Sequence, residues 1–318
     1  MRIVSIARVA PVALAAVIVA GGCAALMPRP SAVVSAPWTP VAPAPAALTE
    51  VAVAAHGGRI WVAGGLLADG VASDEVLVFD PSRGAWSSGP RLPEGIHHAA
   101  LASTGDALLL LGGYTSGGPT AAVRRLADGT AAWADHVPLP DPRAAGAAAF
   151  DGSRVVYAGG VGPRGVAADV FALGVEGWER IGRLPRAREH LAATSDGAGR
   201  TFVLGGRVGG LDGNLATVDL VAAASVTTLG DLPTPRGGVG AFWWPSLGAC
   251  LAGGESPGGT NPQVECMGVS GAVAVLPDLT VARHGVGAAV VGGTAYVVLG
   301  GRKPGLFTSD VTEALALP

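Results

Sequence analysis

Short apolar runs recur along the chain, and a pair of glycines follows each of them. The six runs read IWVA, LLLL, VVYA, TFVL, ACLA and YVVL. The glycine pairs that follow them are Gly64-Gly65, Gly112-Gly113, Gly159-Gly160, Gly205-Gly206, Gly253-Gly254 and Gly300-Gly301. A short apolar run bounded by turn residues is typical of a buried β-strand. Successive pairs are evenly spaced, about 47 residues apart, which predicts six similar units.

A tryptophan marks a second position in the same register. Trp86, Trp133 and Trp178 each lie about 26 residues before the next glycine pair, and a proline-containing turn follows each of them. Further strand-like segments follow the glycine pairs, namely EVLVF at 75–79, DVFAL at 169–173 and TVDLV at 217–221. Each unit is therefore predicted to hold four strands, a to d. The glycine pair ends strand b, and the tryptophan lies in strand d.

The glycine pair, the distant tryptophan and a period of about 50 residues together resemble the kelch repeat. The resemblance implies an all-β fold, a six-bladed β-propeller of the kelch type with four-stranded blades. In such a fold the glycines allow neighbouring backbones to approach closely, and the tryptophans fill the wedge between blades. The last three units depart from the pattern, and Val226 and Val275 lie near the positions expected for tryptophan.

The last unit offers only three strands of its own. Its third strand is the segment VTEALAL after Asp310. Trp38 precedes the first glycine pair by the same offset that separates Trp86 and Trp133 from theirs. The segment around Trp38 is therefore predicted to complete the last blade and to remove an open sheet edge. The alternative places Trp38 in a tether, and the matching offset favours the blade.

The first residues have the pattern of an export signal. Arg2 and Arg8 begin a segment that then carries no charge from Val9 to Met27. The sequence Ala-Gly-Gly-Cys that ends at Cys23 resembles the bacterial lipobox, which implies cleavage before Cys23 and a lipid on its thiol. A plain cleaved signal and a retained membrane helix are the alternatives.

Three regions follow from these patterns. Residues 1–22 are predicted to be a lipoprotein signal peptide, residues 23–36 an Ala/Pro-rich tether, and residues 37–318 the propeller. The expected location is that of an exported, membrane-anchored lipoprotein, in the outer membrane and periplasm or at the cell surface.

Composition and charge exclude two classes of protein. Gly 50 and Pro 24 approach the level at which disorder is suspected, but hydrophobic residues reach 49% and charged residues only 14%. The formal net charge is -3, and no long basic run is present. The chain is therefore not expected to be disordered or to bind nucleic acid.

Cys250 and Cys266 fall in strands b and c of the fifth unit, which are expected to be neighbours. An exported chain meets an oxidising environment, so the two are predicted to form a disulfide. The alternative is a pair of buried free thiols that pack as small apolar groups.

An arginine recurs about 17 residues before the glycine pair in the last four units, at Arg143, Arg188, Arg236 and Arg283. This position lies at the start of strand a, which opens near the axis on one face of a propeller. The functional interpretation is a partial basic ring that binds an anionic group such as a carboxylate. The structural alternative is that these arginines cap the channel or pair with acids.

The b–c loops open on the same face and are the expected place for recognition. Their polar residues are Asp69, Tyr114, Arg164, Arg207, Asp212, Asn214, Glu255, Asn261, Arg302 and Lys303. The histidines of the chain are His56, His97, His98, His136, His190 and His284. His97 and His98 are the only adjacent pair, and adjacent residues on a strand point to opposite faces, which argues against shared metal ligation. No metal site and no cofactor are predicted, and no phosphate-binding loop or nucleophile motif is present.

These patterns favour a binding module for a protein or glycan partner over an enzyme. The second hypothesis rests on a resemblance to sialic-acid epimerase-like propellers, which implies an acidic sugar substrate at an arginine-lined channel mouth. A resemblance to galactose oxidase-like copper enzymes is disfavoured, because Tyr114, Tyr157 and Tyr296 are the only tyrosines available. A scaffold without a small ligand is the third hypothesis.

Overall fold

The computed structural model describes residues 31–32 and 36–317. The predicted signal peptide and Cys23 lie outside the described residues. Within the described ranges, the backbone is almost entirely β-strand and turn, with one 3₁₀ turn, η1, at Leu211–Gly213. No helix in this part of the chain is both long enough and apolar enough to cross a bilayer.

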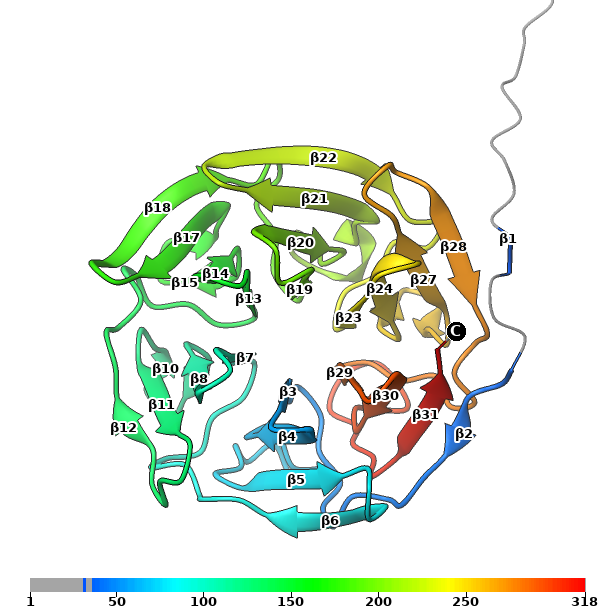
Figure 1. Ribbon diagram of the computed structural model, residues 1–318, viewed down its shortest axis with the longest axis horizontal. Helices are drawn as coiled ribbons and strands as arrows, with labels where there is room; N and C mark the ends of the chain where they lie inside the picture. The colour runs from blue at the N-terminus through cyan, green and yellow to red at the C-terminus, as the bar shows by residue number, and fades with distance from the viewer. Residues whose placement is uncertain (1–30, 33–35, 318) are drawn as a thin grey trace, which may run out of the picture.

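Six β-sheets are arranged radially around a central axis (Figure 1). We number these blades in chain order. From the axis outward, blade 1 consists of β3 (Ala52–His56), β4 (Arg59–Ala63), β5 (Val76–Asp80) and β6 (Ala85–Ser88). Blade 2 consists of β7 (Ala100–Ser103), β8 (Ala107–Leu111), β11 (Val123–Ala127) and β12 (Ala134–Asp135). Blade 3 consists of β13 (Ala147–Phe150), β14 (Val155–Ala158), β17 (Asp169–Gly174) and β18 (Gly177–Arg183).

The last three blades follow the same antiparallel order. Blade 4 consists of β19 (Ala192–Ser195), β20 (Arg200–Leu204), β21 (Thr217–Ala222) and β22 (Ser225–Asp231). Blade 5 consists of β23 (Gly240–Trp244), β24 (Gly248–Ala252), β27 (Val264–Met267) and β28 (Val273–Leu276). Blade 6 consists of β29 (Gly287–Val291), β30 (Thr294–Val298), β31 (Thr312–Ala316) and β2 (Thr39–Pro40). The b–c loops of blades 2, 3 and 5 form small hairpins, at β9 (Tyr114–Thr115) with β10 (Gly118–Pro119), β15 (Val161–Gly162) with β16 (Gly165–Val166), and β25 (Glu255–Ser256) with β26 (Gly259–Thr260). The predicted six-bladed architecture is confirmed.

The N-terminal and C-terminal segments meet in blade 6, as predicted. Strand β2 pairs antiparallel with β31, and Thr39 faces Ala314 in the register (Figure 1). Trp38, directly before β2, is 1% exposed and donates its Nε1 proton to the carbonyl of Pro277 at 2.9 Å. Upstream of β2, β1 (Ser31–Ala32) pairs in parallel with β28 and adds a fifth strand to blade 5.

The core consists of apolar clusters that each join two neighbouring blades. The tryptophans of strand d bridge the same junctions at the rim. Trp86 donates to the Ala42 carbonyl and Trp133 to the Pro90 carbonyl, both at 2.9 Å. Each acceptor lies just after strand d of the preceding blade. The wedge-filling role predicted for the tryptophans is therefore confirmed, with the indole N–H as an added link between blades.

The glycine pairs lie where strand b of one blade meets the next blade. A Cβ atom on Gly64 would lie 2.3 Å from the carbonyl oxygen of Ile96, so a larger residue cannot enter without displacing backbone. Directly after it, Gly65 donates its N–H to that same carbonyl at 2.8 Å. Equivalent bonds join the other blades, from Gly113 to Arg143, Gly160 to Arg188, Gly206 to Arg236, Gly254 to Arg283 and Gly300 to Leu48.

The last glycine pair departs from the expected register by one residue. In blade 6 the two positions are filled by Leu299, with φ 61°, and Gly300, with φ 93°. The prediction that Gly300-Gly301 is the sixth equivalent pair is therefore wrong. Gly301 instead pairs with His284 on the channel face, and the buried Leu299 side chain packs in the junction between blades 6 and 1.

Cys250 and Cys266 lie directly opposite each other on β24 and β27 and are joined by a disulfide. Both residues are fully buried in the junction between blades 5 and 6. In the chain-entropy model, a link across a loop of this size stabilises the fold by roughly 3 kcal/mol.

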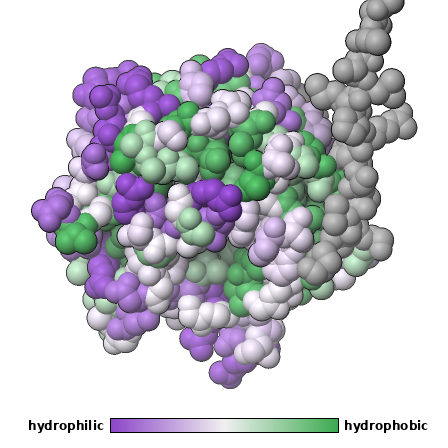
Figure 2. All heavy atoms as spheres, turned by 45° about the horizontal axis from the view of Figure 1, so that its top comes forward, coloured by the Kyte–Doolittle hydropathy of each residue, from purple (hydrophilic) through white to green (hydrophobic). Residues whose placement is uncertain are grey.

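The surface mixes polar and apolar side chains (Figure 2). The exposed large apolar residues are spread over different blades and loops, at Val71, Val137, Val175, Val208, Val269, Leu306 and Phe307. Single apolar residues of this kind are ordinary on a protein surface.

Replacing Trp38 with alanine is expected to reduce the free energy of unfolding by roughly 3–5 kcal/mol, because a fully buried indole leaves a cavity. Chemical unfolding followed by circular dichroism measures the loss. The matched control is Trp178→Ala, since Trp178 occupies the same position in blade 3 but is only half-buried, and it should lose less. Equal losses in the two variants would contradict the role of Trp38 as the buried closing residue.

Candidate functional site at the channel mouth

A ring of backbone hydrogen bonds surrounds the axis at one mouth of the channel. Each blade contributes one residue just before its strand a, and these hub residues are Glu50, His98, Ala145, His190, Gly238 and Gly285. The N–H of each of the last five donates to the carbonyl of the hub residue in the preceding blade, over 2.7 to 3.1 Å. The N–H of Val51 lies 3.5 Å from the Gly285 carbonyl and completes the ring.

All six hub residues adopt the left-handed backbone conformation, with φ between 51° and 67°. Glycine adopts this conformation freely, but other residues lose roughly 1–2 kcal/mol each. Glu50, His98, Ala145 and His190 therefore carry backbone strain that the surrounding hydrogen bonds must offset. Strained residues of this kind cluster at functional sites.

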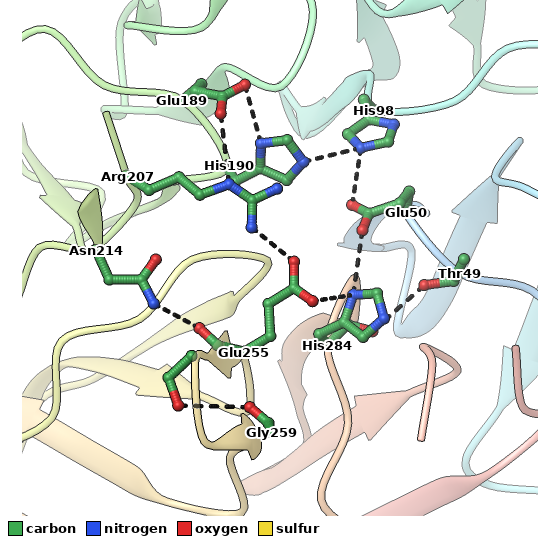
Figure 3. Close-up of polar contacts among 11 residues, drawn as sticks. Thr49, Glu50, His98, Glu189, His190, Arg207, Asn214, Glu255, Gly259 and His284 are labelled. Carbon is green, nitrogen blue, oxygen red and sulfur yellow. Dashed lines mark hydrogen bonds and ion pairs between the residues drawn. The ribbon is translucent and has the colours of Figure 1, made fainter. Parts of the chain in front are cut away.

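Glu50, His98 and His190 direct their side chains toward one another at the mouth (Figure 3). The His98 Nε2 atom lies 3.3 Å from Glu50 Oε2 and 3.0 Å from His190 Nε2. The remaining hub residues are alanine and glycine, so they leave space beside this group. The result is a pocket of about 60 Å³ lined by all six hub residues.

A second set of charged side chains surrounds this group. Arg207 Nη1 lies 2.6 Å from Glu255 Oε1, and Arg207 Nε lies 3.4 Å from Glu189 Oε1. Glu189 Oε2 is in turn 3.1 Å from His190 Nδ1. His284 Nδ1 lies between Glu50 and Glu255, at 3.3 Å and 3.7 Å (Figure 3).

Three further side chains extend the site toward blade 2 and the b–c loop of blade 4. The ring of His97 stacks on Tyr114 with centroids 5.3 Å apart, and His97 Nδ1 lies 2.5 Å from His98 Nδ1. Asn214 donates to the Glu255 carbonyl at 2.7 Å. The side chains of Glu50, Glu189 and Arg207 remain 12 to 13% exposed, so the site is sheltered but open to solvent.

Burial and charge act against each other in this site. Burial alone would raise the pKa of Glu50, but His98, His284 and His190 hold it well below the usual range. Burial lowers the pKa of His98 to about 4, although Glu50 acts in the opposite direction. Burial would also lower the pKa of His284, yet its contacts with Glu50 and Glu255 raise it. Glu50 is therefore ionised at neutral pH.

The four arginines predicted to line the mouth lie inside the blades instead. Arg188, Arg236 and Arg283 have no exposed surface and Arg143 is 4% exposed. Their ion-pair partners within the same blade are Asp219 for Arg188, Glu265 for Arg236, Glu313 for Arg283, and Asp141 with Asp169 for Arg143. Arg236 Nε and Nη2 also donate to carbonyls at the end of strand b. These contacts support the structural alternative, because Arg188, Arg236 and Arg283 each pair with a carboxylate that is itself buried.

The sequence predicted some residues of this site and missed others. Of the polar residues in the b–c loops, Tyr114, Arg207, Asn214 and Glu255 reach the mouth. The prediction that His97 and His98 point apart is wrong, because neither residue lies in a strand: His97 forms an isolated bridge with Tyr114, and His98 has a left-handed backbone with φ 54°. Glu50 and Glu189 were missed. The available signal was the register of the hub residues, which recur at a nearly constant offset before the end of strand b.

Comparison with known proteins agrees with this architecture. A model of the Kelch motif matches residues 47–93, which include all four strands of blade 1. The protein is a kelch-repeat β-propeller. Kelch-like protein terF of Aspergillus terreus is 26% identical to this propeller over 297 residues, which cover 88% of the chain and 56% of terF.

Two other relatives match shorter parts of the propeller. The N-acetylneuraminate epimerase of Brucella suis is 32% identical over 166 residues, or 42% of each chain. Kelch-like protein 35 of Mus musculus is 31% identical over 105 residues, or 33% of this chain and 17% of the mouse protein. The matched regions thus span less than two thirds of each relative.

The variant Arg236→Ala is expected to lose about 3–5 kcal/mol of stability, because it leaves Glu265 buried without its cation. Thermal and chemical unfolding measure the loss. The control is Arg164→Ala: this arginine is 77% exposed and pairs with Asp141 at 2.8 Å, and an exposed pair contributes at most about 1 kcal/mol. An Arg236→Ala protein as stable as the control would overturn the structural role and restore the ligand-binding interpretation.

Proposed function

We propose that this kelch propeller is a binding module of the bacterial cell envelope that holds a protein or glycan ligand over the channel mouth. A lipid on Cys23 would anchor it, and the Ala/Pro-rich segment 23–36 would hold the propeller away from the membrane. The lipobox-like sequence before Cys23 and the disulfide in blade 5 support export to an oxidising compartment.

The array of ionisable side chains on the hub is the observation that carries this proposal. Glu50, His98, Glu189, His190, Arg207, Glu255 and His284 come from five of the blades and meet at one mouth (Figure 3). Glu50, His98 and His190 belong to the ring of backbone hydrogen bonds, and Glu189 and His284 directly precede ring residues in the chain. Pre-positioned groups lose little conformational freedom when a ligand arrives, which favours binding.

The charge balance of the mouth indicates the ligand chemistry. Three carboxylates lie at the mouth: Glu189 and Glu255 pair with the guanidinium of Arg207, and Glu50 lies beside the imidazoles of His98 and His284. Both acidic partners of Arg207 lie within 3.4 Å of it, so its charge is already compensated. The mouth therefore favours groups that donate hydrogen bonds, such as sugar hydroxyls, amines or basic side chains, over a carboxylate.

A second candidate function is an enzyme that acts on an acidic sugar. Its support is the match to the N-acetylneuraminate epimerase of Brucella suis, together with carboxylate–imidazole pairs that are suited to proton transfer. The four arginines first expected to bind the substrate carboxylate are buried in ion pairs. A substrate carboxylate would therefore have to bind Arg207 in competition with Glu189 and Glu255.

The binding function is tested with Glu255→Gln and with Arg59→Ala as the matched control. Arg59 pairs with Asp80 at 3.3 Å and lies at the a–b turns, on the opposite face of the ring. Immobilised proteins are exposed to envelope polysaccharides and to a peptide library rich in lysine and arginine. The change at the mouth should weaken retention of the ligand at least tenfold, because a hydrogen bond to a charged group is lost from a sheltered site. The control should bind like the unchanged protein.

Equal retention by both variants would contradict a ligand site at this mouth. The enzyme hypothesis is separated by incubating the protein with N-acetylneuraminate and following epimerisation by nuclear magnetic resonance. Turnover that disappears in Arg207→Ala would favour the enzyme over the binding module.

A further inference from the structure

Three electron-rich groups converge at the hub from three different blades. A ring nitrogen of His98, a ring nitrogen of His190 and a carboxylate oxygen of Glu50 all lie within 4.8 Å of one another. We propose that Glu50, His98 and His190 form a binding site for a divalent transition-metal ion. This inference goes beyond the proposed binding function and does not depend on the identity of a protein or glycan ligand.

The donor set suits a transition metal. Two imidazole nitrogens with one carboxylate oxygen bind Zn²⁺ in sites that keep a fourth position open, and the same set binds Fe²⁺ with further open positions. Hard ions such as Ca²⁺ and Mg²⁺ prefer sites made of oxygen atoms alone. The space beside the three side chains, a pocket of about 60 Å³, can hold the remaining ligands of the metal.

The second nitrogen of each imidazole has a neighbour that favours the required tautomer. Glu189 Oε2 lies 3.1 Å from His190 Nδ1, so a proton is favoured there and the Nε2 atom keeps its lone pair. A proton on His98 Nδ1 can be donated to His97 Nδ1, 2.5 Å away, which leaves the Nε2 lone pair of His98 free as well. A carboxylate that orients a metal-binding histidine is the usual outer partner in such sites.

These tautomers place two lone pairs face to face. The Nε2 atoms of His98 and His190 are 3.0 Å apart, and Glu50 Oε2 is 3.3 Å from the first of them. Two unprotonated nitrogens repel at this distance unless a positive centre lies beside them. A metal ion supplies that centre, and the alternative is a single proton held between the two rings.

The backbone and the neighbouring charges keep the three ligands in place. All three belong to the hub ring, and ligands on rigid elements bind with the least reorganisation. His284 Nδ1 lies 3.3 Å from Glu50 Oε1, which orients the carboxylate and leaves Oε2 directed at His98. The guanidinium of Arg207 is paired with Glu189 and Glu255, so its charge is compensated beside the site.

The test is a titration of the full-length protein with Zn²⁺, after dialysis against a chelator and without a histidine tag. Competition with a chromophoric zinc chelator gives the affinity and stoichiometry, and Co²⁺ gives an absorption spectrum that reports nitrogen ligation. One equivalent of either metal is expected to bind. His190→Ala and His98→Ala should lose this binding, and Glu189→Gln should weaken it about 10- to 100-fold, as removal of an outer partner does.

The matched control is His56→Ala on the opposite mouth, where the ring nitrogens of His56 contact Ser103 and Asp128. This variant should bind one equivalent with unchanged affinity. Circular dichroism and thermal unfolding show whether each variant is folded, and Glu50→Gln, which preserves the shape of the side chain, serves if a histidine variant does not fold. Absence of stoichiometric Zn²⁺ and Co²⁺ binding would overturn the proposal in favour of a shared proton. Binding that survives in both His98→Ala and Glu50→Gln would overturn it equally.

Discussion

The hydrogen-bonded ring at the hub is the constraint on which the rest of the molecule depends. One backbone N–H from each blade reaches the carbonyl of the blade before it, and the sixth contact returns to Val51. No blade can form its contact alone, because the donor and the acceptor belong to different sheets. The ring therefore requires all six blades in place, and the segment at Trp38 completes the last of them.

The same ring determines where chemistry can occur. Its geometry requires a left-handed residue at each hub position, and glycine would satisfy that requirement with the least strain. Only Gly238 and Gly285 follow this rule, whereas Glu50, His98 and His190 carry functional groups at a strained backbone. A strained backbone at three residues that carry a carboxylate and two imidazoles is the pattern expected of a ligand-binding site.

The repeat made the fold predictable, because glycine and tryptophan are each required by a contact that recurs in every blade. The last glycine pair was predicted one residue too far along the chain. In blade 6 the first position of the pair is occupied by Leu299, and a leucine does not indicate a left-handed backbone. The arginines of the last four blades were located correctly, but sequence spacing does not say whether a guanidinium faces the channel or the blade. Glu265 and Glu313, two residues of strand c that bury these charges, have no distinctive spacing of their own.

The site itself was harder to predict for a different reason. Its residues lie outside the four strands of the blades, and the alternation of a strand was applied to His97 and His98, where it does not hold. Glu50 and Glu189 were not predicted as site residues, because a single acidic residue near the start of a strand is common on any protein surface. Only the shared register of the hub residues connects Glu50 with His98 and His190 across almost half of the chain.

Hydrogen exchange of the hub amides tests the dependence of every blade on ring closure most directly. Mass spectrometry would compare peptides that contain His98, Ala145, His190, Gly238 and Gly285 in the full chain and in a chain that begins at residue 46. The account predicts that these amides are strongly protected in the full chain and that the truncation, which opens the edge of β31, lowers the protection of all of them together. A loss of protection confined to blade 6, with the other hub amides unchanged, would show that the blades are held independently and would contradict the account.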